Sequence, residues 1–180
     1  MRLILSMLLL GGCVLSAAAQ KYISEKSFVS FFSDASIEDI KAENTKSTSL
    51  LDLASQDIAF SMLIAEFKFD KKLMQQHFNE KYLESEKYPK STFAGKVFGF
   101  SAGATGQQNV TVKGKLTIHG VAREVEVPGT MQMANGQIMA DAKFSVKLED
   151  YNVPRPQILW KNIAEQVEVT VSFTYKPYEK

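Results

Sequence analysis

The chain has 180 residues, of which 45% are hydrophobic and 23% are charged, with 21 basic and 20 acidic side chains. This is an ordinary globular composition, and the length suits one domain. The near-neutral balance, without a basic stripe, argues against nucleic acid as a partner. A single cysteine excludes an internal disulfide framework.

The first nineteen residues differ from the rest of the chain. Arg2 is their only charge, residues 3–14 are almost wholly apolar, and Ala17-Ala18-Ala19 ends the run. This pattern predicts a secretory signal peptide cleaved after Ala19, which leaves a domain over 20–180 and implies secretion, in a bacterium into the periplasm. The alternatives are a membrane anchor, for which the run is short, and a lipoprotein attached through Cys13. No second stretch is long enough to span a membrane.

The predicted domain begins with strands. Lys21 to Ser33 reads as a first strand, and residues 37–53 read as a long strand with a break near Asn44 to Ser47. A turn follows at residues 52–57. Ile58, Phe60, Met62 and Ile64 then alternate, and Phe67 and Phe69 continue the pattern one residue out of phase. A one-residue shift of this kind predicts a β-bulge.

A helix near residues 70–85 interrupts the strands. Asp70 is a good N-cap residue, and Pro89 closes the segment before a strand over residues 91–100. The apolar face recurs at spacings of three and four, which predicts an amphipathic helix; its members are Leu73, Met74, His77, Phe78 and Tyr82.

The second half predicts antiparallel hairpins. Residues 102–106 form a glycine-rich connection, and residues 110–118 then alternate apolar and polar side chains. Pro128-Gly129 interrupts the next strand, which marks an edge or a bulge. Asn135-Gly136 predicts a type I′ turn before an alternating strand over 138–148. A loop over 150–157, a short helical turn over 158–166 and a last strand over 167–175 complete the chain.

These elements predict a mainly all-β fold of about eight antiparallel strands with one inserted α-helix. Helices do not alternate with the strands, so a parallel sheet is excluded. Eight antiparallel strands remove their edges by closing into a barrel, and a barrel of that size holds one small ligand.

The sequence contains none of the common catalytic motifs, and we assign no catalytic residue, no metal site and no cofactor. A buried histidine hydrogen-bonded to the backbone is the favoured interpretation of His77, with a ligand-contacting or haem-ligating group as the alternative. His119, beside Gly120 at a strand end, is interpreted as a turn residue whose imidazole holds a loop. Two histidines without a third ligand make a poor metal site.

Abundant phenylalanine and methionine suggest an apolar cavity, with a plain packed core as the alternative. We predict that the following residues line a ligand pocket: Phe60, Met62, Phe67, Phe69, Leu73, Met74, His77, Phe78, Phe93, Phe144 and Trp160.

Three groups of residues resemble the YceI-like family, and together they cover nearly all of the chain after the signal segment. They are the helical run Leu73-Met74, His77-Phe78-Asn79-Glu80 and Tyr82-Leu83-Glu84 with Lys87-Tyr88-Pro89 and Phe93-Ala94-Gly95; residues 114–121 with Arg123; and Phe144-Ser145-Val146, Asp150-Tyr151 and 167–171.

This resemblance implies a lipocalin-like extended barrel, secreted to the periplasm, that binds a polyisoprenoid or another long-chain amphiphile. A lipid carrier is therefore the first hypothesis. The second is an enzyme that acts on such a lipid with His77 as base, and the third is an envelope interaction protein whose barrel is filled by its own side chains. The exposed strands and the neutral charge are compatible with a homodimer.

Overall fold

The computed structural model describes residues 21–34, 39–154 and 165–178. The predicted signal peptide, Trp160 and all but the last two residues of the predicted helical turn over 158–166 lie outside these residues; Gln166 is the first residue of β10 rather than part of a helical turn. The strands are β1 Lys21–Ser33, β2 Ile40–Asn44, β3 Thr48–Asp52, β4 Asp57–Leu63, β5 Lys68–Phe69, β6 Lys90–Phe98, β7 Gln107–Ile118, β8 Val121–Ala134, β9 Gln137–Lys147 and β10 Gln166–Pro177. The helical elements are the 3₁₀ turn η1 Ile64–Glu66, the helix α1 Lys72–His77, the π-turn η2 Phe78–Tyr82 and the 3₁₀ turn η3 Leu148–Tyr151.

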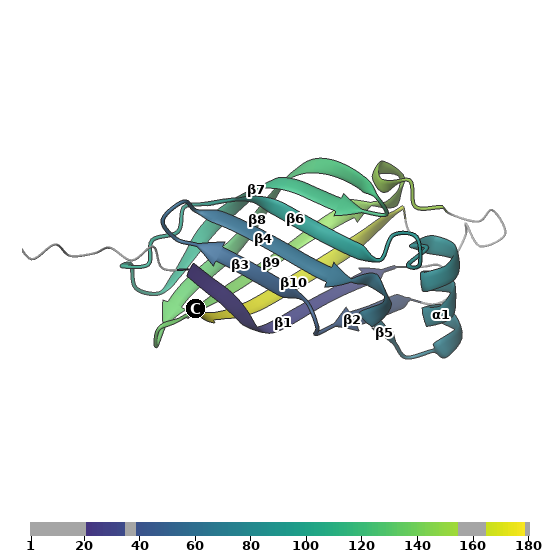
Figure 1. The fold of residues 1–180 in the computed structure, drawn as a ribbon, viewed down its shortest axis with the longest axis horizontal. Coiled ribbons are helices and arrows are strands. Elements are labelled where there is room, and N and C mark those ends of the chain that lie inside the picture. Colours follow the sequence, from purple (N-terminus) through teal and green to yellow (C-terminus); the bar gives the residue numbers. More distant parts are fainter. Residues whose placement is uncertain (1–20, 35–38, 155–164, 179–180) are drawn as a thin grey trace, which may run out of the picture.

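The strands form one antiparallel sheet that closes on itself (Figure 1). The ring runs β1–β10–β9–β8–β7–β6–β4–β3, and β3 returns to β1. It has eight positions, as the sequence predicts. β2 pairs with the far half of β1, on the same side as β3, and carries β5 as its outer partner. The expected break in residues 37–53 is confirmed and lies between β2 and β3.

The two ends of the barrel are built differently (Figure 1). One end carries α1 and η2, and we call it the helix end. The other, the turn end, carries the connections over 53–56, 99–106 and 135–136. The predicted Asn135-Gly136 hairpin is confirmed there, because both residues have positive φ angles, 52° and 76°, as a type I′ turn requires.

A second two-residue turn, His119-Gly120, joins β7 to β8 at the helix end. The φ angles are 51° and 73°. A Cβ atom on Gly120 would lie 2.6 Å from the ring of Tyr88, so this position needs glycine for close approach as well as for its backbone conformation.

Two local predictions are wrong, and a third, which concerns Pro128, is wrong about the interruption but right about an edge. The phase shift before Phe67 is not a β-bulge: the 3₁₀ turn η1 produces it, and the Phe67 N–H donates to the Ile64 carbonyl at 3.2 Å. Asp70 does not cap α1, because Lys71 occupies the N-cap position with no side-chain cap. Pro128 does not interrupt β8, which pairs with β7 without a register shift. Since β9 pairs with β8 only from Gly129 onward, Pro128 lies on an unpaired edge, where its missing N–H is tolerated.

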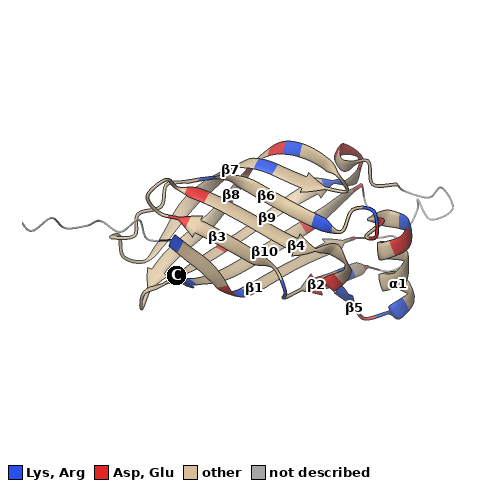
Figure 2. Ribbon diagram, in the orientation of Figure 1, with Lys and Arg blue, Asp and Glu red and all other residues tan. Residues whose placement is uncertain are grey.

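The outer surface is charged with both signs. Figure 2 shows Lys, Arg, Asp and Glu interspersed over the strands and the helix. Exposed ion pairs link neighbouring strands, such as Lys113–Glu126 at 2.9 Å and Lys143–Glu168 at 2.8 Å. Such pairs contribute little to stability. Among the described helices, none has the length and apolar character that a transmembrane helix needs.

Candidate functional site

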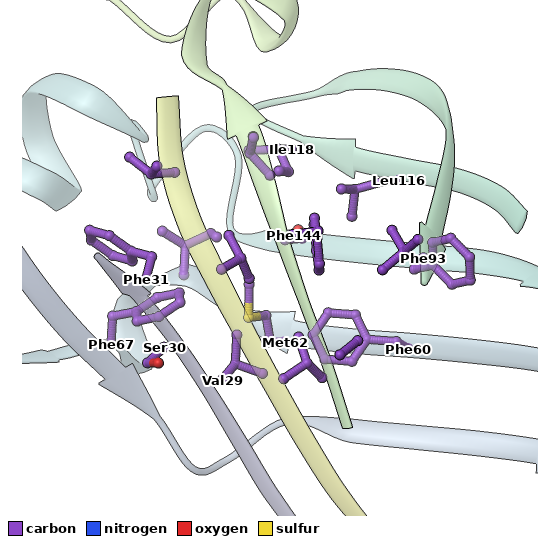
Figure 3. Close-up of a pocket in the computed structure, with 18 of the residues that line it drawn as sticks. Val29, Ser30, Phe31, Phe60, Met62, Phe67, Phe93, Leu116, Ile118 and Phe144 are labelled. Atoms are coloured by element: carbon purple, nitrogen blue, oxygen red, sulfur yellow. The ribbon is translucent and has the colours of Figure 1, made fainter. Parts of the chain in front are cut away.

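A cavity of about 440 Å³ lies inside the barrel. Its size falls within the range of small-molecule sites. The inward positions of the ring strands line it, because successive side chains of a strand alternate between the two faces of the sheet. Figure 3 shows Phe60, Met62, Phe93, Leu116 and Phe144 pointing into the same space from four strands.

The barrel is hollow and is not filled by its own side chains. Phe60, Phe93 and Phe144 point inward but are only partly buried, because part of each ring borders the cavity. Ordinary protein interiors are packed to the density of organic crystals. The cavity therefore argues against the packed-core alternative and against a barrel filled by its own side chains.

Three hydroxyl groups of the cavity wall, those of Ser49, Ser91 and Tyr175, are used within the protein. Ser49 Oγ donates to the Ala59 carbonyl at 2.9 Å, and Ser91 Oγ donates to the Thr117 carbonyl at 2.9 Å. Since the single hydroxyl hydrogen of Ser49 is already used, the Tyr175 hydroxyl donates to Ser49 Oγ across 2.8 Å. Burial raises the pKa of Tyr175, so the phenol stays neutral. The wall therefore presents an apolar surface.

Four phenylalanines fasten the helical segment to the helix end. Phe78, the first residue of η2, stacks on Phe31 at 5.4 Å between ring centroids and contacts Phe67 at 5.5 Å and Phe69 at 5.0 Å. Aromatic pairs at such distances add to the energy of apolar burial. This phenylalanine cluster, Phe31, Phe67, Phe69 and Phe78, also forms part of the cavity wall.

Polar groups meet the cavity at the helix end. Met74, His77 and Tyr82 line it from α1 and η2. The favoured interpretation of His77 is wrong: the side chain is only partly buried, and it makes no hydrogen bond with any other residue in the described part of the chain. Burial raises the pKa of Tyr82, so its phenol is a neutral group that can hydrogen-bond to a ligand.

Nine of the eleven predicted pocket residues line the cavity, from Phe60 to Phe144 along the chain. Leu73 does not: its side chain is 62% exposed on the flank of the first turn of α1, so the expectation that it faces inward is wrong. Trp160 lies outside the described residues. Whether the nine contact a ligand stays a prediction.

His119 joins three segments of the helix end. Its ring is 7% exposed, Nε2 lies 2.8 Å from Glu84 Oε2, and Nδ1 lies 3.3 Å from the Tyr151 carbonyl oxygen. The Tyr88 ring packs against the imidazole in an edge-to-face arrangement, with 4.4 Å between the ring centroids. The interpretation that this imidazole holds a loop is confirmed: it fastens the segment after η2 to the β7–β8 turn and to η3.

Sequence reasoning missed most of the wall, because the nine predicted residues are a minority of those that line the cavity. The inward valines and leucine of β7, β8 and β10, for example Val112, Leu116 and Val127, line the cavity beside the phenylalanines. Their alternation was visible in the sequence and was assigned to a half-buried strand. Ser49 and Tyr175 carried no signal, because their contact joins residues that are 126 positions apart.

A YceI-like domain model matches residues 21–175. The chain belongs to the YceI-like family. A search of curated proteins returned no significant match. Among solved structures, this YceI-like protein resembles Burkholderia cenocepacia BcnA, with a TM-score of 0.70 at 22% identity, over 82% of this chain and 95% of that one.

Two further structures share the fold. A polyisoprenoid-binding domain from Saccharophagus degradans, implicated in plant cell wall breakdown, gives a TM-score of 0.75 at 17% identity, over 87% of this chain and 98% of that one. A Campylobacter jejuni YceI protein gives 0.62 at 15% identity, over 82% and 90%. At these identities the similarity shows the fold alone, and it agrees with the lipocalin-like barrel predicted from the sequence.

Proposed function

We propose that this YceI-like protein binds one long-chain apolar or amphiphilic molecule, of the polyisoprenoid or fatty-acid type, inside its barrel. The observation that carries the proposal is a hollow of about 440 Å³ lined mainly by apolar side chains, in which the hydroxyls of Ser49, Ser91 and Tyr175 donate to protein acceptors. An apolar chain loses no hydrogen bond on entering such a site, whereas a polar ligand would leave buried groups unpaired. The solved relative from Saccharophagus degradans, described as polyisoprenoid-binding, supports the same ligand class.

The ligand's orientation follows from the position of the polar groups. His77 and Tyr82 lie at the helix end of the cavity, so a hydroxyl or carboxyl head group would lie there and the tail would extend toward the turn end. Each methylene buried contributes roughly 0.8 kcal/mol, so the tail supplies most of the affinity.

Binding is favoured over catalysis. A histidine base is normally oriented by a second group, and His77 has no hydrogen-bond partner within the described residues. The predicted signal peptide over residues 1–19 supports a carrier that acts in the periplasm. The long hydrophobic cargo would be shielded there from water.

Native mass spectrometry of the protein purified from bacterial cells, followed by organic extraction, tests the proposal. We expect a bound species whose mass matches a long-chain lipid and which is released by solvent. The proposal would be overturned if the purified protein never carries lipid and if its mass does not increase when isoprenoid alcohols or fatty acids are added.

A matched pair of substitutions on one helix turn tests the location. Met74→Gln places a polar group in the cavity wall and should lower the affinity for a fatty acid severalfold, since an amide buried there has no partner. Leu73→Gln, on the adjacent exposed position, should leave the affinity unchanged. Equal affinities in the two variants would contradict a site inside the barrel.

A further inference from the structure

The turn end of the barrel is blocked by a layer of fully buried side chains. Tyr22, Leu51, Ile138 and Tyr175 are among the largest fully buried residues described, at 0–2% exposure. Their backbones are neighbours: Tyr22 pairs with Leu51, and Tyr175 pairs with Ile138, on strands that are consecutive around the ring. We call these four residues the floor.

Of these four, only Tyr175 faces the cavity. The hydrogen bond from its hydroxyl to Ser49 holds the ring across β1, and Ser49 is in turn bonded to the Ala59 carbonyl on β4. The ring also contacts Phe173 at 5.7 Å, and Phe173 contacts Phe60 at 5.7 Å. The ring is therefore positioned by direct contacts with Ser49 on β3 and with Phe173 on its own strand.

A second hollow lies beyond the floor. It measures about 220 Å³ and is lined by residues of the turn end, Leu51, Leu53, Gln56, Val97, Phe100, Ser101 and Ala102. It shares no lining residue with the main cavity. The floor is the partition between the two spaces, because Leu51 faces the second hollow and Tyr175 faces the first.

We propose that Tyr175, held by Ser49, is the chain-length determinant of this site. The inference rests on the proposed function: the tip of the bound tail would end against the Tyr175 ring, and the methylenes of a longer chain would stay in water at the helix end. The ring acts as the floor through its volume, and its packing against Phe173 keeps it in place together with the hydrogen bond to Ser49.

A homologous series of straight-chain fatty acids, measured by displacement of a fluorescent probe, tests this. For the wild-type protein the affinity should rise about fourfold per methylene up to a limiting length and then stay constant. Tyr175→Val removes the ring, adds its volume to the main cavity and should move the limit to longer chains. Tyr175→Phe is the matched control: it keeps the ring, and Ser49 still donates to Ala59, so the limit should not move.

A second variant, expected to shorten the limiting chain length, keeps the test valid if Tyr175→Val does not fold. Ala140 lines the cavity on β9, two positions from Ile138 on the same face and opposite Phe173 on β10. Ala140→Met adds volume directly above the floor and should shorten the limiting length.

The outcomes separate the inference from the proposed function. A limit that is the same in wild type, Tyr175→Val and Ala140→Met would overturn the inference and leave lipid binding intact. If Tyr175→Val does not fold, an unchanged limit in Ala140→Met has the same consequence. Absence of binding by the wild-type protein to every member would overturn the proposed function and this inference with it.

Discussion

The helix end and the turn end close the same barrel by different means. At the helix end a short helical segment is fastened by one aromatic ring, Phe78, and by the His119–Glu84 hydrogen bond. At the turn end, side chains of the ring strands themselves fill the interior, with Tyr22 and Tyr175 fully buried. The helix end is therefore an attached element, whereas the turn end is part of the continuous sheet.

This difference predicts a difference in stability within one domain. Local segments with few buried contacts open at low free energy, whereas core strands open only with global unfolding. A ligand has to enter through a part of the protein that can open. The helix end is the candidate entrance for that reason, and the predictions below test the contrast from the largest expected effect to the smallest.

Tyr22→Ala should be the most destabilising substitution. It removes a ring that is 2% exposed and leaves a void in the floor, which costs about 3–5 kcal/mol for large aromatic residues. Chemical denaturation measures the loss. Tyr178→Ala, an exposed tyrosine near the same end, is the control and should change the free energy of unfolding by less than about 0.5 kcal/mol. Equal effects would contradict the packed floor.

Phe78→Ala should act locally. It removes the centre of the phenylalanine cluster and should lower the free energy of opening of residues 72–83 by about 3 kcal/mol. Hydrogen exchange should show faster exchange of the helix amides, while the denaturation midpoint moves less than in Tyr22→Ala. If the strands lose protection to the same degree as the helix, the two ends do not differ as proposed.

Glu84→Gln should have a smaller effect at the same end. It weakens the 2.8 Å bond to His119 by removing the charged acceptor, at a cost of about 1 kcal/mol. Denaturation of the variant measures this cost. Glu86→Gln, two residues away and exposed, should be neutral, and a Glu84 variant as stable as this control would show that the bond does not fasten the loop.

Tyr175→Phe should have the smallest effect of these substitutions on the free energy of unfolding at neutral pH. Its difference from the wild type should appear in alkali. Burial raises the pKa of Tyr175 in the folded protein, whereas in the unfolded chain it is about 10. The stability of the folded state is therefore unaffected by this group below about pH 10. It falls as the pH rises further, because the Tyr175 phenol ionises in the unfolded chain before it ionises in the folded protein. The variant should lose less stability between neutral and alkaline pH.

Three other tyrosines also contribute to the loss of stability in alkali, but they contribute equally in the wild type and in Tyr175→Phe. Burial also raises the pKa values of Tyr22, Tyr82 and Tyr151, so wild type and variant both lose stability in alkali. The denaturation midpoint against pH should nevertheless be flatter for Tyr175→Phe. Superimposable curves would contradict a neutral, buried Tyr175.

Local patterns predicted the strands well and the irregular segments less well. The alternation in β7 and β9 and the Asn135-Gly136 turn record local geometry, and all are observed. The phase shift before Phe67 records only that one residue is out of step. A bulge and a 3₁₀ turn produce the same shift, so the pattern could not distinguish them.

The candidate site shows the same division. Phe60, Met62 and Phe93 were predicted from alternation, which tells which face of a strand is apolar. The exposure of Leu73 depends on how α1 is rotated over the helix end, and that rotation is decided by the ring contacts of Phe78 with three other segments.

The sequence by itself determined the inward faces, the approximate number of strands in the ring and the antiparallel order, because these depend on side-chain period and turn chemistry, which act over a few residues. Only the tertiary structure decided that the interior is hollow and where it ends. Hollowness depends on whether side chains from opposite walls meet, and the floor depends on Tyr175 reaching Ser49 across 126 positions. Both depend on contacts between residues that are far apart in the sequence, and local sequence patterns do not record such contacts.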